Sequence, residues 1–421
     1  MRLATFPLLW RLHSTKRFVR FRRTGVVSLL SAVLALASSE AVSARSTQSA
    51  PEFSLPAPNG ELGHEFRRVR AVRELSDGRV IVLDCCDRDH PLLVVDFTRG
   101  KATPIGRRGS GPGEYQFLRS LVPLGRDTSL LTDEGLRRWL ILYRDSVVLT
   151  LRADRALLRS MGQLLLGGDR RARVLSLQGS GFLDPVPVQG AFYADSALLL
   201  RGDLHRHRID TVGRMRGGRA RMQQVQFAGR NGESPTYFTP NPLAATDQAL
   251  LHVDEWIAVA HIDPFAVDWI SPTGERIIGK TLPVATVRVT EAERRAAMDR
   301  QFGAASRSTA TSAFTDWPQR VPPFLEDALL PLAGGEVAIH RTNLGRVPRE
   351  RYDIIDRRSV LIATIRTGRN ERIVGFGARG VFVEHTNADG FVHFKRHPLP
   401  AAWALTTGRD DRIVTRLPSR P

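Results

Sequence analysis

The chain has 421 residues, 42% hydrophobic and 25% charged, which is the composition of an ordinary globular protein. Its formal net charge is +18, but residues 1–44 hold seven lysines and arginines against one acidic residue, so the remainder carries +12. Arginine dominates this excess, a skew that reflects genome base composition. The charge is spread without a basic block, which disfavours a nucleic-acid partner.

Residues 1–44 have the pattern of an export signal. A basic segment from Lys16 to Arg23 precedes the apolar run 25–37, and Val42-Ser43-Ala44 resembles a cleavage site. The alternative is an uncleaved N-terminal anchor, although an apolar run of about 13 residues is short of the ~20 that a membrane span needs. No other stretch is long enough to span a bilayer. We therefore expect a periplasmic or extracellular protein without a membrane span once the signal is removed.

The remaining chain divides into a linker at 45–61, a body at 62–400 and a C-terminal tail at 401–421. In the body, apolar or β-branched runs of four to eight residues alternate with Gly, Asp and Pro, as in β-strands. Two kinds of turn recur. A tight turn leading into a strand is expected in 74–84, 124–133, 193–203, 245–254, 332–340 and 377–385. An aspartate followed by a turn between strands is expected in 94–101, 142–149, 208–215, 267–275 and 352–359.

The first turn type occurs six times at intervals of about 45–55 residues where nothing is inserted. That interval suits one four-stranded sheet per repeat, and radially arranged sheets cover each other's faces. The predicted fold is therefore all-β, a six-bladed β-propeller with a short helical insertion.

The segments SDGRVIVLD, VVDFTRG and IGRRGSGPGEYQF together resemble the first blade of bacterial exported six-bladed β-propellers of the NHL/TolB-like type. The resemblance extends over the body through the Pro-rich VPPFLEDALL (321–330) and a GGEVAI turn. It implies a six-bladed propeller but no single activity, because relatives include binding scaffolds, lactonases and lyases.

Two stretches interrupt the repeat. Residues 155–192 contain the Leu-rich piece LLLGG (164–168), for which the pattern assigns no strand partner. Residues 284–324 form the insertion, in which Thr290 and Glu293 make a capping box before a helix at 291–302. The insertion is either an ordinary family feature or a lid over the central channel.

The Gly-rich segment from Gly106 to Tyr115 predicts a shaped loop between two sheets. As a binding site it would be an anion nest made by Arg107, Arg108, Gly109 and Gly111. The favoured alternative is a structural crossover, with the arginines solvated or paired with Glu114.

Lactonases among the resembled proteins hold calcium with Glu, Asn and Asp side chains. Here the candidate metal ligands are Asp84, Asp133, Asp203 and Asp254, which close successive strands. Turn-forming aspartates are the favoured interpretation, so we expect no cofactor, with calcium as the alternative.

Cys85 and Cys86 are the only cysteines and are adjacent. They lack zinc-site spacing, and a disulfide between neighbours is strained, so a turn with two small residues is favoured.

The sequence contains no recognisable catalytic motif. It favours an exported, monomeric ligand-binding or protein-interaction scaffold whose partner is an unidentified protein, glycan or small molecule. The alternative is a metal-dependent propeller hydrolase, lactonase or lyase with its site in the central channel.

Overall fold

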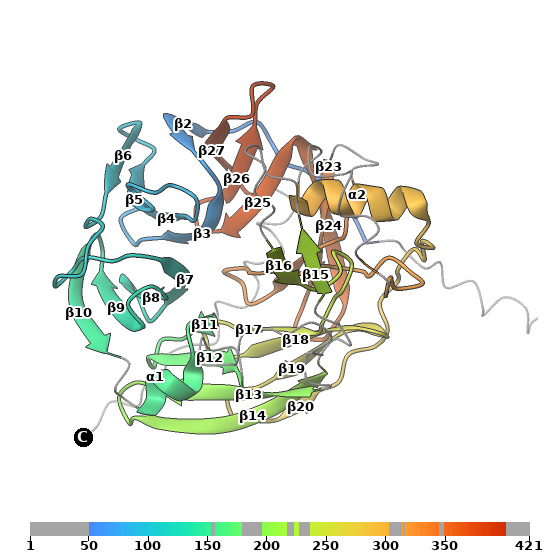
Figure 1. Ribbon diagram of the computed structural model, residues 1–421, viewed down its shortest axis with the longest axis horizontal. Helices are drawn as coiled ribbons and strands as arrows, with labels where there is room; N and C mark the ends of the chain where they lie inside the picture. Colours follow the sequence, from blue (N-terminus) through green and yellow to red (C-terminus); the bar gives the residue numbers. More distant parts are fainter. Residues whose placement is uncertain are drawn as a thin grey trace, which may run out of the picture. The chain divides into compact units, whose positions relative to one another are not determined.

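The computed structural model describes residues 50–152, 156–178, 196–216, 223–226, 236–302, 314, 316–344 and 349–400. The predicted signal at 1–44 and tail at 401–421 lie outside these residues. The described part is mostly β, built from antiparallel sheets (Figure 1). No helix within the described ranges has the length and apolar character that crossing a membrane requires.

Most strands form antiparallel blocks of four that follow one another along the chain, and two of these blocks join into one eight-stranded sheet. Two consecutive sheets consist of β3 (Val69–Glu74), β4 (Val80–Asp84), β5 (Leu92–Asp96) and β6 (Lys101–Pro104), then β7 (Leu118–Pro123), β8 (Thr128–Asp133), β9 (Arg138–Tyr143) and β10 (Ser146–Arg152). After helix α1 (Ala156–Met161) come β11 (Leu165–Gly168), β12 (Arg173–Leu177), β13 (Ser196–Asp203) and β14 (Arg208–Arg216). A separate hairpin follows, formed by β15 (Gln223–Gln226) and β16 (Thr236–Thr239).

The second half continues in the same way. The next strands are β17 (Gln248–Leu251), β18 (Ile257–Ile262), β19 (Phe265–Ile270) and β20 (Arg276–Ile277), followed by helix α2 (Glu291–Phe302). Then come β21 (Leu329–Pro331), β22 (Val337–His340), β23 (Arg349–Ile355) and β24 (Leu361–Arg369). The last are β25 (Glu371–Phe376), β26 (Val381–Thr386) and β27 (Val392–His397).

The first strands of these sheets contact one another in chain order. Strand β3 contacts β7, β7 contacts β11, β11 contacts β17, β17 contacts β21, and β21 contacts β25. Strand β25 in turn contacts β3, so the series of contacts closes on itself (Figure 1).

The hydrophobic core is distributed between neighbouring sheets. One cluster joins Ile81 and Leu83 of β4 to Leu131 and Leu140 of the following sheet. Another joins Val82 of β4, on the other face of that strand, to the sheet of β25–β27. Corresponding clusters lie between each later pair of consecutive sheets. Strand β4 is therefore buried along its whole length, and it reads as an uninterrupted apolar run because both of its faces are covered.

Gly167 allows two of these sheets to approach closely. It lies in β11 at φ +128° and pairs in parallel with Leu251 of β17. A Cβ atom at this position would lie 2.3 Å from the carbonyl oxygen of Leu251. Only glycine fits both the backbone conformation and the space.

The N-terminal part of the described chain joins two later sheets. Strand β1 (Glu52–Ser54), within the expected linker, pairs in parallel with β24. Strand β2 (Gly60–Phe66) pairs with β27 and completes the last sheet. Residues 52–54 therefore form an edge strand of a sheet that is distant in sequence.

The expected turns agree with the structure in most repeats but not in the middle of the chain. The LLLGG piece contains β11, the first strand of its sheet, which turns at Asp169–Ala172 into β12. For segment 193–203, the predicted turn at 193–195 lies outside the described residues, and the predicted strand is β13. Segment 208–215 was expected to turn, but it lies within β14. In the next block of strands, the turn equivalent to Asp169–Ala172 lies at His252–Glu255, where it joins β17 to β18.

The insertion contains the predicted helix at its predicted bounds, Glu291–Phe302. The backbone N–H of Thr290 donates a 3.0 Å hydrogen bond to the Glu293 carboxylate, which is one half of a capping box. At the other end, Arg300 donates to the carbonyl oxygen of Asn343 at 2.8 Å. The helix is thus tied to the segment between β22 and β23.

Candidate functional site

The strand order defines two faces. We call the face where the first strand of each sheet turns into the second the turn face; it contains the turns at 75–79, 124–127 and 252–255. We call the opposite face, where the first strands begin, the loop face. Because strands alternate in direction, the Gly-rich loop and the β4–β5 loop both lie on the loop face.

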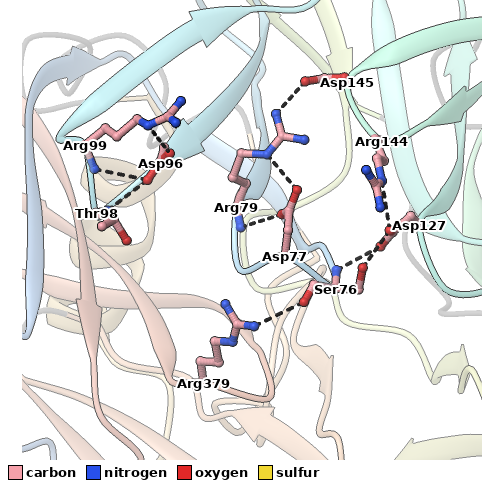
Figure 2. A network of polar contacts seen from close by, with 10 residues as sticks. All are labelled: Ser76, Asp77, Arg79, Asp96, Thr98, Arg99, Asp127, Arg144, Asp145 and Arg379. Atoms are coloured by element: carbon pink, nitrogen blue, oxygen red, sulfur yellow. Dashed lines mark hydrogen bonds and ion pairs between the residues drawn. The ribbon is translucent and has the colours of Figure 1, made fainter.

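Charged groups on the turn face connect neighbouring sheets (Figure 2). The Asp127 carboxylate accepts hydrogen bonds from the backbone N–H and hydroxyl of Ser76 at 2.8 and 2.7 Å, and from Arg144 at 3.2 Å. Arg79 lies between Asp77, at 2.9 Å, and Asp145, at 2.5 Å. These contacts join the turn between β3 and β4 to the next sheet.

The network continues to the last sheet, because Arg379 donates to the carbonyl oxygen of Ser76 at 3.1 Å (Figure 2). Burial alone raises the pKa of Asp127, but hydrogen bonds from Ser76 and Arg144 outweigh it and hold the pKa below its usual value. The charges on this face therefore stabilise the folded chain.

The Gly-rich loop on the loop face is closed by its own side chains. Its backbone folds back, with the N–H of Gly109 donating to the carbonyl of Tyr115 at 3.0 Å. The buried Tyr115 hydroxyl donates to the Ile105 carbonyl at 2.8 Å. Gly106 and Gly113 adopt φ +67° and +72°, which is the left-handed region that favours glycine.

The residues predicted to form an anion nest already have partners. The Glu114 carboxylate accepts from the N–H of Gly111 and from Arg107, both at 2.7 Å. Arg108 donates to the carbonyl of Arg88 at 3.1 Å. The hydrogen bonds from Gly111 and Arg107 lower the pKa of Glu114. A bound anion at this loop would have to displace Glu114.

Two of the candidate metal ligands lie on the loop face and hold backbone groups. The buried Asp84 carboxylate accepts from the N–H groups of Arg67 and Arg68 at 2.6 and 2.9 Å. The buried Asp133 accepts from the N–H of Phe117 at 3.0 Å. Each carboxylate thus fixes the segment that leads into the first strand of its own sheet.

The other two candidates lie on the turn face. Asp203 accepts from the backbone of His205 and Arg206 at 3.0 and 2.8 Å in the β13–β14 turn. Asp254 forms an ion pair with Arg357 of a neighbouring sheet. The four aspartates are therefore not brought together. Across the described residues, no cluster of three or more His, Cys, Asp and Glu side chains has the geometry to hold a metal ion.

Cys85 and Cys86 are free thiols in the β4–β5 loop, with their sulfur atoms 3.0 Å apart. Cys86 is exposed, yet desolvation, with a contribution from the Cys85 thiol, raises its pKa to about 11. A thiol with such a pKa is largely protonated near neutral pH and is a poor nucleophile and metal ligand.

A different group of charges converges on the loop face, and we call it the loop-face cluster. It consists of Arg70, Arg119, Glu134, Glu326 and Asp327. Arg70 and Arg119 are the second residues of β3 and β7, and Glu134 directly follows β8. Glu326 and Asp327 lie just before strand β21.

The electrostatics place these groups near one another. Burial raises the pKa of Glu134, while the positive charges of Arg119 and Arg70 act in the opposite direction. Burial and the nearby Asp327 raise the pKa of Glu326, again opposed by Arg119. Arg119 therefore interacts with carboxylates from its own sheet and from the β21 side.

This convergence spans the contact cycle. Strands β7 and β21 are separated by two first strands in either direction, so they lie opposite each other in the cycle. The charge of Arg119 therefore acts on Glu326 across its middle. Arg70 and Arg119 form no hydrogen bond or ion pair with other described residues, and the Arg119 Nε atom is buried without a partner. Such perturbed, incompletely paired groups are typical of functional sites.

Sequence reasoning missed this cluster, although two signals were present. An arginine occupies the second position of β3, β7 and β25, and Glu326-Asp327 lies within the Pro-rich segment leading into β21. The third arginine, Arg372, has a structural role, because it joins Glu384 at 2.9 Å and the Val69 carbonyl at 2.7 Å.

No family model and no curated protein matches the sequence. The structure is similar to a protein of Bacteroides fragilis assigned as exported, with 10% identity over 83% of this chain and 99% of that chain and a TM-score of 0.44. It is also similar to virginiamycin B lyase from Staphylococcus aureus, with 8% identity, 81% and 98% coverage and a TM-score of 0.39. A third is the calcium-binding protein regucalcin from Agrobacterium tumefaciens, with 11% identity, 83% and 96% coverage and a TM-score of 0.34. Identities and TM-scores of this size assign no activity to the chain.

Proposed function

We propose that the chain is an exported six-bladed β-propeller that binds an acidic sugar or glycan at the loop-face cluster. The six-bladed arrangement is supported by the closed cycle of contacts among β3, β7, β11, β17, β21 and β25. Export is supported by the signal pattern of residues 1–44.

The observation that carries the proposal is that the unpaired Arg119 acts electrostatically on both Glu134 and Glu326, which come from opposite sides of the cycle. Unpaired guanidinium groups bind carboxylates through two parallel hydrogen bonds. The glutamate carboxylates accept hydrogen bonds from hydroxyl groups. A ligand with both carboxylate and hydroxyl groups, such as a uronic acid, uses both halves of the cluster.

Calorimetric titration of the full chain with glucuronate and with oligogalacturonate tests this proposal. Arg119→Gln should weaken binding about tenfold to a hundredfold, because one charge-assisted contact is lost. Arg358→Gln is the matched control, since Arg358 is an exposed arginine on the turn face. Equal affinities of wild type and Arg119→Gln would refute the assignment, as would failure of both probes to bind.

A second candidate function uses the same cluster for acid–base catalysis on such a sugar. It is favoured by the raised pKa values of Glu134 and Glu326, because proton-transfer groups work best with pKa values near neutrality. A calcium-dependent enzyme has less support, because the described residues include no group of three or more side chains placed to hold a metal ion. Release of reducing ends or unsaturated products from oligogalacturonate would show an enzyme, whereas binding without turnover would indicate a scaffold.

A further inference from the structure

The insertion contains a cavity that neither the motifs nor the loop-face cluster explain. It has a volume of about 540 Å³ and lies between the segment before α2, the first turn of that helix and the chain near Trp317. Three arginines line it: Arg288, Arg294 and Arg320. No acidic side chain is among the lining residues in the described part of the chain.

The backbone places two of these arginines directly opposite each other. Arg288 and Arg320 form an antiparallel bridge. It is held by hydrogen bonds from Val289 N–H to Gln319 O at 3.0 Å and from Val321 N–H to Val287 O at 2.9 Å. Directly opposed like charges destabilise a strand pair. Both residues are exposed, so water screens part of the repulsion, and neither guanidinium group forms an ion pair with another described residue.

The third arginine, Arg294, lines the cavity beside an aromatic ring. The Arg294 guanidinium carbon lies 5.6 Å from the centre of the Trp317 ring, which is a cation–π geometry. The ring is fixed because its N–H donates to the Phe314 carbonyl at 3.0 Å. The buried Arg294 Nε atom has no hydrogen-bond partner, and Glu291, 3.9 Å from the guanidinium, is a weak counterion.

We propose that this cavity binds a small phosphate- or sulfate-bearing compound. The planar guanidinium group matches the geometry of tetrahedral oxyanions. An anion held between Arg288 and Arg320 removes their repulsion and provides an acceptor for Arg294. The surface of Val289, Trp317 and Pro318 accommodates the organic part of the ligand. The volume lies within the range of about 300–1,000 Å³ that is usual for small-molecule sites.

The test is calorimetric titration of the full chain with inorganic phosphate, pyrophosphate and sulfate at low and moderate salt. We expect wild-type protein to bind at least one of these anions, more weakly at higher salt. The double variant Arg288→Gln/Arg320→Gln should lose at least tenfold in affinity. Arg206→Gln is the control, because Arg206 is exposed in the distant β13–β14 turn.

The results of these titrations distinguish the cavity in the insertion from the loop-face cluster. Preference for phosphate over sulfate, or the reverse, identifies the class of ligand, and Arg119→Gln should leave the binding unchanged. The double variant should also melt at a slightly higher temperature without ligand, because the opposed charges are gone, and this confirms that it folds. The proposal is overturned if no anion binds, if the double variant binds like wild type, or if Arg206→Gln loses as much affinity.

Discussion

The two faces of the sheets differ in how their charged side chains are used. On the turn face, Asp127, Arg79 and Arg379 connect one sheet to the next through paired contacts (Figure 2). On the loop face, Arg119 acts on Glu326 through its charge, and no hydrogen bond or ion pair joins the two side chains. The contrast is not complete: on the turn face, burial raises the pKa of Glu336, and buried atoms of Glu74 and Asp254 lack hydrogen-bond partners. The comparison indicates that paired charges on the turn face contribute stability, whereas the loop face carries the cluster for which we propose a ligand.

The strongest test of the structural role is Asp127→Asn. This buried carboxylate holds Ser76 and Arg144, so its loss should lower the free energy of unfolding by about 2 kcal/mol, measured by urea denaturation. Asp96→Asn is the control, because the contacts of Asp96 stay within one turn: the backbone N–H groups of Thr98 and Arg99, and the exposed Arg99 side chain at 3.7 Å (Figure 2). This change should cost about 0.5 kcal/mol. If both variants lost the same free energy of unfolding, the contacts that Asp127 makes between sheets would contribute no extra stability.

The same carboxylates predict how stability depends on pH. Hydrogen bonds and ion pairs hold the pKa of Asp127 and Asp145 below their unfolded values. Their stabilisation is therefore present above the unfolded pKa of about 4 and is lost as the pH falls through the lower folded values. We expect the melting temperature to fall steeply below about pH 4, and Asp127→Asn to flatten that dependence. If the melting temperature of Asp127→Asn depended on pH as steeply as that of the wild type, Asp127 would not be a source of this pH dependence.

A third prediction concerns Cys86 on the loop face. A pKa of about 11 against an ordinary 9.0 reduces the thiolate fraction about a hundredfold near pH 8. Higher nucleophilicity of the more basic thiolate compensates in part, so alkylation by iodoacetamide should be about tenfold slower than for an unperturbed thiol. Cys85→Ala should accelerate the reaction of Cys86, because Cys85 contributes to the raised pKa. Rapid alkylation of Cys86 in wild-type protein would argue for a reactive thiol instead.

These comparisons also show what the sequence could predict. The turn in ELSDGRVIVLD joins β3 and β4 because Gly78 adopts φ +90°, and the helix 291–302 follows from its cap and composition. The prediction from sequence was wrong for the middle repeats. Strand β11 is only four residues long, and the turn that follows it, Asp169–Ala172, contains no Asp-Gly or Gly-Gly pair to mark it. The LLLGG piece therefore read as an interruption.

The candidate site was less accessible to sequence reasoning. Asp84 and Asp133 stood out because each closes an apolar strand, but both are occupied by backbone N–H groups. The electrostatic interaction of Arg119 with Glu326 depends on the closure of the cycle of sheets. No local pattern connects residues separated by more than two hundred positions in sequence.

The smallest expected effect gives the most direct test of the contrast between faces. Burial and Asp327 raise the pKa of Glu326, so the folded chain disfavours its ionised form and loses stability as the pH rises through that pKa. Glu326→Gln should therefore raise the free energy of unfolding at pH 7, by no more than about 0.5 kcal/mol, while weakening uronate binding.

Glu114→Gln is the matched change on the same face, and it should have the opposite effect on stability, because Arg107 and Gly111 lower the pKa of Glu114. Denaturation curves for both variants, run with and without glucuronate, separate the two roles. If Glu326→Gln were instead less stable than wild type, Glu326 would be holding sheets together as Asp127 does, and the loop face would lose its distinction as the binding face.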